Sequence, residues 1–189
     1  FQEPANINTM AITNINSLQP QNYYSLAKLY TEGRHRSMTE YNIVDLRIFN
    51  YFSRTADIKS RFFITDLITA VKNNVIFKTS SEDMIRDYLH PTDLVQLITK
   101  VLKGPPSNIG LDCYTKNSIS KSEILNLFES RYGLQVEISK ESKILNSTGL
   151  KSNYFSVNFK AGDYGYKPEF SSYDGLVDSL DAMLIENIV

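Results

Sequence analysis

A tyrosine and a lysine stand four residues apart in the segment "QNYYSLAKLYTE", residues 21–32, which has the pattern of a helix. Positions i and i+4 of a helix share one face, with Cβ atoms roughly 5–6 Å apart. A free tyrosine has a pKa of about 10 and is a poor base at neutral pH, but a nearby ammonium favours the phenolate. Tyr24 and Lys28 could therefore act as an acid–base pair. On spacing alone, such a pair is more often a packed ring beside a solvated lysine.

We expect structural roles for the other residues whose side chains could react or bind a metal. Two histidines and one cysteine do not make a metal site. We expect His90 to be a hydrogen-bonded structural residue, His35 to be solvated near a helix end, and Cys113 to be a small buried hydrophobe. Asp93 falls in the first turn of a predicted helix, where a carboxylate is favoured. Asp87 is also expected to be structural.

The composition of the 189 residues is that of an average globular protein, with 42% hydrophobic and 22% charged residues. The net charge of −1 gives no broad attraction to nucleic acid or to an anionic membrane. The 12 Tyr and 10 Phe are not accompanied by clustered basic residues, so they indicate a core and not a base-stacking surface. One cysteine excludes an internal disulfide and favours a reducing, cytoplasmic compartment. No apolar run has membrane-spanning length.

Helical and strand patterns alternate along the chain. Helices are predicted over 22–38, 61–74, 91–104, 120–133 and 171–188, and strands over 43–50, 75–77, 83–90, 105–114 and 134–139. The helix at 120–133 opens with a capping box, Ser120 and Glu123, and ends at Gly133. In the helix at 91–104, one apolar side is expected to consist of Leu94, Leu97, Ile98, Val101 and Leu102. The alternation predicts an α/β fold with a mainly parallel sheet.

Five motifs, in this order, carry a resemblance to a known family. They are "PQNYYSLAKLYTE", "LRIFNYF", "RDYLHPTDLVQLI", "SNIG" and "GYKPEFSSYDGLVDSL". Together they resemble the Tyr-x-x-x-Lys helix and the following segments of the extended short-chain dehydrogenase/reductases. The subfamily is that of the NAD-dependent epimerases and dehydratases of nucleotide sugars. The resemblance implies a Rossmann-like, doubly wound parallel sheet with a smaller α/β substrate-binding domain.

The resemblance implies a role for four residues. Tyr24 matches the catalytic tyrosine, and Lys28 matches the lysine that lowers the tyrosine pKa and holds the nicotinamide ribose of NAD or NADP. Asn50 and Arg86 match residues that contact the nucleotide sugar, with Arg86 on its diphosphate, which suits a guanidinium. Their alternatives are a strand-terminal turn residue for Asn50 and a surface pair with a neighbouring aspartate for Arg86.

The resemblance also implies how the chain is organised. Residues 1–55 and 84–103 would belong to the cofactor domain, and residues 56–83 and 104–189 to the substrate domain. No Gly-rich phosphate loop occurs in the chain, whereas the family carries one upstream. We therefore expect the C-terminal part of an epimerase or dehydratase, inactive by itself, that couples Tyr/Lys acid–base chemistry to hydride transfer. The family's usual homodimer would use the helix at 22–38, through Leu26, Leu29 and Tyr30.

Some positions depart from the family pattern. Ser25 and Ala27 stand where the family often has Gly and Ser, and Ser53 and Arg54 replace its Gly-Pro. The segment "TSSED", residues 79–83, replaces a Gly-containing turn. These changes motivate a second hypothesis, a non-catalytic relative that binds a nucleotide sugar or serves as a scaffold.

Overall fold

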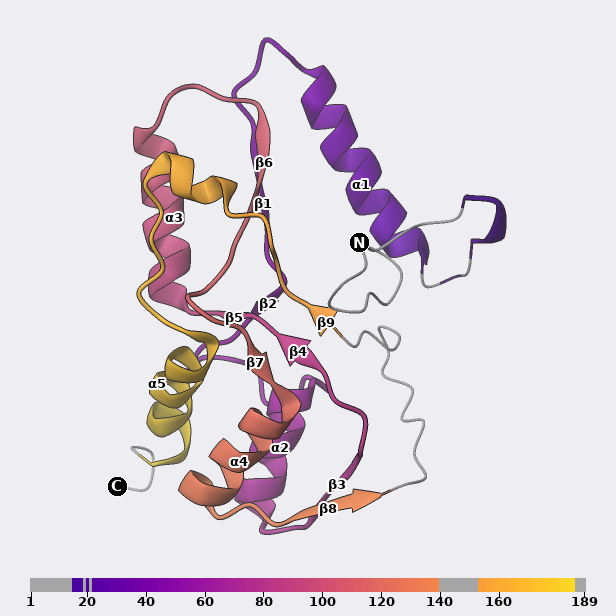
Figure 1. The fold of residues 1–189 in the computed structure, drawn as a ribbon, viewed down its shortest axis with the longest axis vertical. Coiled ribbons are helices and arrows are strands. Elements are labelled where there is room, and N and C mark those ends of the chain that lie inside the picture. The colour runs from indigo at the N-terminus through magenta and orange to yellow at the C-terminus, as the bar shows by residue number, and fades with distance from the viewer. Residues whose placement is uncertain (1–14, 19, 21, 140–152, 186–189) are drawn as a thin grey trace.

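The structure, a computed structural model, describes residues 15–18, 20, 22–139 and 153–185 (Figure 1). The helices are η1 (Ile15–Ser17), α1 (Asn22–Ser37), α2 (Phe63–Asn73), α3 (Pro91–Lys103), α4 (Lys121–Tyr132), η2 (Lys160–Tyr164) and α5 (Ser172–Leu184), where η marks 3-10 turns. The strands are β1 (Val44–Arg47), β2 (Asn50–Tyr51), β3 (Phe77–Ser80), β4 (Ile85–Arg86), β5 (Tyr88–Leu89), β6 (Ile109–Asp112), β7 (Ile119–Ser120), β8 (Val136–Ser139) and β9 (Asn153–Tyr154).

The strands form small, mainly parallel sheets. β1 pairs with β6, β2 with β5 and β3 with β8, all in parallel. β4 lies between β9, which is parallel to it, and β7, which is antiparallel. In the β1–β6 pair, Arg47 stands opposite Asp112. The α/β prediction with a mainly parallel sheet is confirmed.

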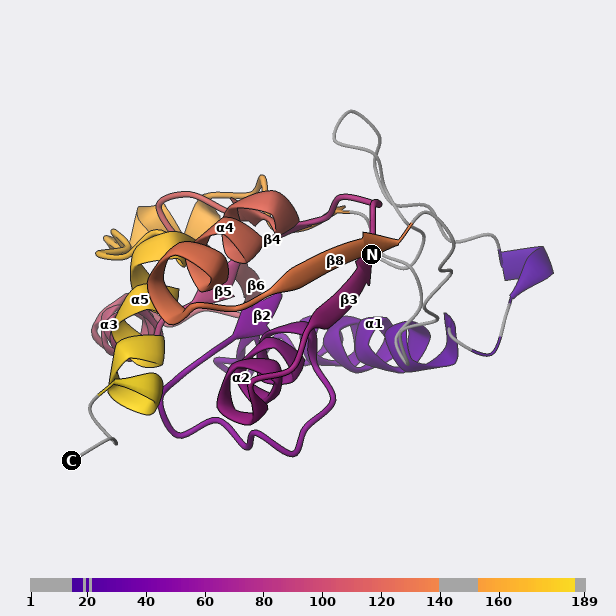
Figure 2. The same cartoon turned by 90° about the horizontal axis from the view of Figure 1, so that it is seen from below.

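Helices flank both ends of the molecule. α1 lies on one side of the β1–β6 pair and α3 on the other (Figure 1). At the opposite end, α2 and α4 lie beside the β3–β8 pair, as Figures 1 and 2 both show. The short strands β4, β5, β7 and β9 lie between the two ends (Figure 1).

Two clusters of buried hydrophobic side chains make up the core. The first lies among α2, α4 and α5 and includes Ile68, Phe128 and Leu180, all fully buried. The second lies around α3 and β6, and its buried members are Leu89, Leu97, Leu111, Cys113, Tyr114, Ala161 and Tyr166. Cys113 is thus the buried hydrophobe that the sequence predicts, and burial raises the pKa of its thiol to about 12.

Two predicted strands are each divided in the structure. The run at 43–50 becomes β1 and β2 because the chain changes partner, from β6 to β5. The run at 83–90 becomes β4 and β5, with Asp87 between them. The side chain of Asp87 is drawn inward to accept a hydrogen bond from the Thr115 hydroxyl at 2.5 Å. Partner choice and buried polar contacts of this kind are tertiary effects that a local pattern does not contain.

Other boundaries also differ from the predictions. The sequence predicts a strand over 75–77, but the strand begins only at Phe77. The Val75 N–H instead donates a hydrogen bond to the carbonyl of Ala70, at the end of α2. On α3, Ile98 is 40% exposed and Leu102 is 80% exposed, so the apolar side is narrower than predicted. Residues 1–14 and 186–189, also covered by predictions, lie outside the described residues.

Helix ends follow the predicted signals more closely. The Ser120 hydroxyl accepts from the N–H of Glu123 at 3.2 Å, and the carboxylate of Glu123 accepts from the N–H of Ser120 at 2.8 Å. This is the predicted capping box of α4. Gly133 ends the same helix with φ = 69°, in the left-handed region where a Cβ is unfavourable. Asn74 ends α2 in the same conformation, with φ = 51°.

Candidate functional site

A cavity of about 360 Å³ lies between α1, β1 and β9. Its volume is in the range of small-molecule sites, which is about 300–1,000 Å³. Polar and aromatic side chains share the lining, which includes Tyr24, Lys28, Glu32, Arg47, Phe49 and Tyr154. The lining therefore combines titratable groups on α1 with groups at the ends of β1 and β9.

Tyr24 and Lys28 lie together on the cavity side of α1. The Lys28 ammonium Nζ is 5.5 Å from the centroid of the Tyr24 ring, within the distance at which a cation is attracted to an aromatic face. Both side chains are solvent-exposed, Tyr24 to 72%. The pair that the sequence singled out thus faces an open cavity and is not packed into the core.

One turn after Lys28, Glu32 holds α1 against the sheet. The Arg47 Nε donates to Glu32 Oε2 at 2.9 Å, and Arg47 Nη2 donates to Oε1. The third guanidinium nitrogen, Nη1, donates to Asp112 Oδ1 at 2.8 Å. Bidentate, charge-assisted pairs of this kind are the strong ones. The hydrogen bonds to Arg47 hold the pKa of Glu32 below its ordinary value, and those to Glu32 and Asp112 raise the pKa of Arg47.

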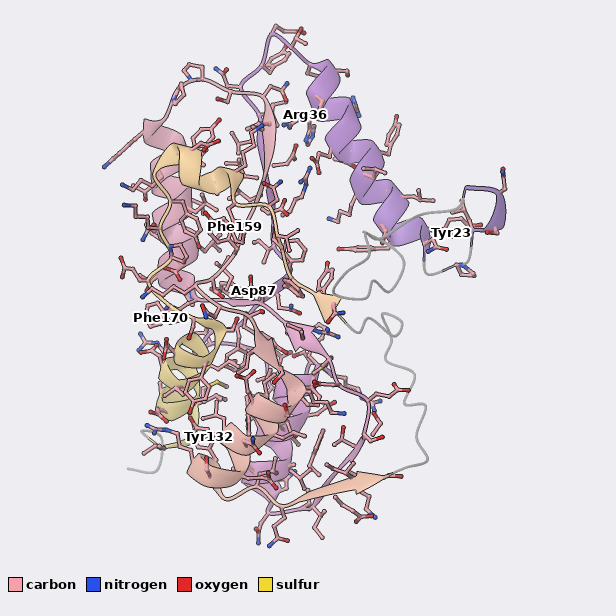
Figure 3. All side chains as sticks on the ribbon, viewed as in Figure 1. Tyr23, Arg36, Asp87, Tyr132, Phe159 and Phe170 are labelled. Atoms are coloured by element: carbon pink, nitrogen blue, oxygen red, sulfur yellow. The ribbon has the colours of Figure 1, made fainter. Side chains whose placement is uncertain are left out.

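Near the C-terminal end of α1, a second set of ion pairs makes the same connection. Arg36 Nη2 donates to Asp45 Oδ2, and the ring nitrogen Nδ1 of His35 lies 2.8 Å from Asp45 Oδ1. Figure 3 labels Arg36 at this end of the helix. The expectation that His35 is solvated is wrong, because Asp45 comes from β1, ten residues away, to meet it.

The pH dependence of the attachment of α1 follows from Glu32. A carboxyl group whose pKa is lowered in the folded state contributes stability that is present above its unfolded value, here about 4.5, and is lost as the pH falls through the lowered folded value. Acidification below pH 4.5 should therefore weaken the α1–β1 contact. Amide hydrogen exchange in α1 should speed up relative to α2. In Glu32→Gln this acid-induced difference should largely disappear, and an unchanged difference would contradict the assignment.

Asn50 and Arg86 lie beside the cavity and not in its lining. The Asn50 amide Nδ2 donates to the backbone carbonyl of Asp87 at 3.4 Å. Arg86 is half-buried on β4, opposite Tyr154 of β9, and its Nη1 donates to the carbonyl of Ile85 at 2.8 Å. Burial lowers the pKa of Arg86, and the tyrosines 88 and 154 oppose this effect. The structure thus separates the four predicted residues into one pair inside the cavity and one pair next to it.

Tyr154 and Phe49 connect these two pairs, and neither is among the site residues predicted from the sequence. Their rings meet edge to face with centroids 5.2 Å apart, and both line the cavity. Phe49 precedes Asn50, and Tyr154 stands opposite Arg86 in the β4–β9 register. Burial is the main cause of a raised pKa of Tyr154, to which Tyr24 also contributes. The motif "LRIFNYF" contains Phe49, but the two residues of β9, Asn153 and Tyr154, are too short a run to carry a periodic signal.

Asp87 joins segments of the chain that are far apart in sequence. Its buried carboxylate accepts hydrogen bonds from the side-chain hydroxyls of Thr115 at 2.5 Å and Ser172 at 3.0 Å. Burial raises its pKa, and these hydrogen bonds oppose the increase. Figure 3 shows Asp87 near the centre of the molecule, where the two ends meet.

Asp93 and His90 hold the segment before α5. The two oxygens of Asp93 accept from the backbone N–H groups of Glu169 at 2.7 Å and Phe170 at 3.1 Å. The His90 ring stacks on Phe170 with centroids 4.0 Å apart, and its Nδ1 accepts from the N–H of Thr92 at the start of α3. Neither residue lines the cavity.

Neither a metal centre nor a membrane-spanning helix occurs in the part of the chain that the structure describes. Within residues 15–18, 20, 22–139 and 153–185, no three His, Cys, Asp or Glu side chains converge as metal ligands would. Over the same residues, no helix combines the length and apolar character needed to cross a bilayer.

Solved structures share this fold. RMD from Pseudomonas aeruginosa, complexed with NADPH, is 16% identical with a TM-score of 0.73, over 98% of this chain and 64% of its own. A UDP-glucuronic acid 4-epimerase variant from Bacillus cereus, with a fluorinated UDP-sugar and NAD, is 16% identical with a TM-score of 0.72, over 96% and 56%. DesIV, a dTDP-glucose 4,6-dehydratase from Streptomyces venezuelae, is 17% identical with a TM-score of 0.69, over 93% and 55%. The chain thus spans less than two thirds of these proteins.

Sequence comparisons agree with the fold. Comparison with curated proteins found no match. The sequence profile of the NAD dependent epimerase/dehydratase family matches residues 4–110, more than half of the chain. This range contains the Tyr24–Lys28 helix, the strands β1 to β5 and the first four of the five motifs, and the family resemblance is confirmed. The chain is a member of the NAD-dependent epimerase/dehydratase family.

Proposed function

We propose that this chain is the C-terminal part of an NAD(P)-dependent nucleotide-sugar epimerase, dehydratase or reductase. The observation that carries the proposal is the position of Tyr24 and Lys28, with the ammonium 5.5 Å from the ring centroid and both side chains lining a cavity of about 360 Å³. RMD, solved with NADPH, supports the cofactor class. The dTDP-glucose 4,6-dehydratase and the UDP-glucuronic acid 4-epimerase, both solved with NAD, support the cofactor and the substrate class.

The Tyr24 hydroxyl would exchange a proton with a sugar hydroxyl or keto oxygen, as a general acid or base. The Lys28 ammonium would stabilise the negative charge that the phenol oxygen gains when it gives up its proton. When bound, NAD(P) supplies or accepts the hydride. Lys28 and Tyr24 would hold its nicotinamide-ribose end. They fit that end of the cofactor, whereas the chain has no Gly-rich loop for the pyrophosphate.

We propose that the active protein also includes a segment that carries this loop. Two observations support it. The chain spans only 55–64% of the similar structures described above, and among the described strands β1 pairs on one edge only, with β6. A sheet of two strands is marginal by itself. The intact mass and N-terminal sequence of the natural gene product test this directly. A product of about 21.6 kDa that starts at Phe1 would contradict it.

Three further expectations are retained as proposals. A homodimer through α1 is supported by the exposed side chains of Leu29 and Tyr30, at 53% and 74%. The division into a cofactor domain and a substrate domain stays a proposal: the core has two clusters, but the second joins Leu89 and Leu97 to Leu111 across the expected bounds. A cytoplasmic location rests on the single cysteine, Cys113, which is buried.

Arg86 is proposed to bind the diphosphate of the nucleotide sugar. Arg86→Gln in the intact protein should weaken the binding of UDP or dTDP by about 10–100-fold, because hydrogen bonds to a charged group contribute about 1.5–3 kcal/mol. Calorimetric titration measures the change. Arg131→Gln is the matched control, since Arg131 pairs with Asp181 between α4 and α5. An equal loss in both variants, or none in Arg86→Gln, would remove Arg86 from the binding site.

The activity itself is tested on the intact gene product. Incubation with UDP- and dTDP-hexoses, followed by NMR of the sugar products, should reveal an epimerised or dehydrated sugar when NAD or NADP is supplied, or a reduced sugar when a keto sugar is supplied with NADH or NADPH. The altered segments Ser53–Arg54 and 79–83 favour the alternative of a non-catalytic relative. Ser53 is buried, with its hydroxyl 3.0 Å from that of Thr55. Tight binding of a nucleotide sugar with no conversion of any substrate would support that alternative.

A further inference from the structure

Both carboxylates that line the cavity are already paired. The charged and titratable side chains facing Lys28 come from three elements: Tyr24 and Glu32 on α1, Asp45 and Arg47 on β1, and Tyr154 on β9. Glu32 is held by Arg47, and Asp45 by Arg36 and His35. Within the described residues, Lys28 forms no ion pair. Its ammonium therefore remains available to Tyr24.

Glu32 is the residue that would otherwise capture Lys28. It follows Lys28 by four positions on α1, so the two side chains lie on one helical face within reach of an ion pair. The Glu32 side chain is only 16% exposed and both of its oxygens face Arg47. Arg47 outcompetes Lys28 for this carboxylate because a guanidinium binds both oxygens at once, whereas an ammonium is a single point charge.

Arg47 is in turn fixed from the sheet. Its Nη1 donates to Asp112, the residue opposite it in the β1–β6 register, at 2.8 Å. The other oxygen of Asp112 accepts from the Ser156 hydroxyl at 2.6 Å. Gly110 leaves room for the pair: a Cβ at this position would lie 2.8 Å from Arg47 Nη2 and would collide with the Glu32 carboxylate. The arrangement is held from both strands, and a side chain at position 110 would displace the ends of Glu32 and Arg47.

We propose that Arg47 is a positioning residue that withholds the Glu32 carboxylate from Lys28 and so reserves the lysine charge for Tyr24. The inference rests on the proposed function, in which Tyr24 and Lys28 are the acid–base pair. It adds that the chemistry depends on a guanidinium that need not touch the substrate. Removing Arg47 releases Glu32 to pair with Lys28, and the phenol oxygen of Tyr24 then loses its stabilising cation.

A double-variant experiment separates this role from simple bracing of α1. In the intact protein, Arg47→Gln should lower kcat by about 10–100-fold, a part of what general acid–base catalysis contributes, with KM changed much less. Arg47→Gln combined with Glu32→Gln should recover most of the lost kcat, because position 32 then has no carboxylate to capture Lys28, and Asp45 stays paired with Arg36 and His35. If Arg47 only braces α1, the double variant also lacks the bridge and stays as slow as Arg47→Gln. That result would overturn the proposal.

A second readout does not need turnover. Lysines methylated with ¹³C give NMR signals that follow their protonation, and the Lys28 signal is identified by its absence in Lys28→Arg. In Arg47→Gln the pH midpoint of this signal should rise, because the released Glu32 carboxylate stabilises the ammonium. In the double variant the midpoint should fall back to that of the natural protein. An unchanged midpoint overturns the proposal. If the Lys28 midpoint shifts as expected but the natural protein has no turnover, Arg47 does keep Glu32 from Lys28, and it is the proposed function that is rejected.

Two further variants guard against misfolding and against general charge effects. Glu32→Gln alone keeps Arg47 and its bond to Asp112, and it should lower kcat much less than Arg47→Gln does. An equal loss in both would indicate bracing and contradict the proposal. Arg131→Gln breaks another bidentate pair, with Asp181 at the far end of the molecule, and should move neither kcat nor the Lys28 midpoint.

Discussion

Tyr24→Phe is expected to reduce the turnover of the intact protein by about 10²–10⁴-fold, the usual contribution of a general acid or base. The substitution removes only the phenol oxygen and leaves the ring beneath the Lys28 ammonium. Because Tyr24 is 72% exposed, its hydroxyl carries little packing energy. The thermal unfolding midpoint and the affinity for the nucleotide sugar should stay close to those of the natural protein, so the loss should fall on kcat.

The same helix offers a matched control. Tyr30 is also an exposed tyrosine of α1, at 74%, but it does not line the cavity. Tyr30→Phe should retain full turnover. If Tyr24→Phe remained active, or if both variants lost activity equally, Tyr24 would not be the proton-transferring residue and the non-catalytic alternative would gain weight.

Leu97→Ala is expected to destabilise the fold by about 2–5 kcal/mol, the range for truncating a buried leucine. Leu97 lies on α3 with 0% exposure, in the cluster that includes Leu89 and Leu111. Its loss would leave a cavity on the side of the β1–β6 pair that faces α3. Urea unfolding of the purified protein, followed by circular dichroism, measures the change in the free energy of unfolding.

Leu102→Ala on the same helix provides the comparison. The apolar spacing of the sequence assigned both leucines to one face, but Leu102 is 80% exposed. Its truncation should change the free energy of unfolding by less than about 0.5 kcal/mol, as surface substitutions usually do. Similar losses of unfolding free energy in the two variants would show that Leu102 is also buried, against a partner or a further part of a longer chain.

The sequence predicted the elements whose signals are local. The capping box of Ser120 and Glu123, the stop at Gly133 and the helix at 22–37 needed only neighbouring residues, and they occur where the pattern indicates. The division of the 43–50 run into two strands was not predicted. It occurs because β1 pairs with β6, whereas β2, after Ile48 and Phe49, pairs with β5. Which strand a segment joins depends on residues far along the chain, and alternation alone does not contain that choice.

The same limit applies to the site. Tyr24 and Lys28 were found because four-residue spacing on a helix brings two side chains together. Arg47, Asp112 and Tyr154 are not among the predicted site residues. Strand pairing, and not spacing along the sequence, brings Arg47 and Tyr154 to the cavity and Asp112 to Arg47. His35 was misjudged for the same reason: its partner, Asp45, arrives from the next strand. Residues that act through long-range contacts give no periodic signal.

The pairing of β1 with β6 also shapes how the chain must fold. Arg47 and Asp112 are 65 residues apart, so a large loop must close before this pair of strands forms. Loop closure of this kind slows folding, and parallel pairing is intrinsically late. During synthesis at about 5–20 residues per second, β1 leaves the ribosome seconds before its partner exists. In that interval the unpaired backbone edge of β1 is exposed to other chains. We therefore expect chaperones to bind this segment before the rest of the chain is made.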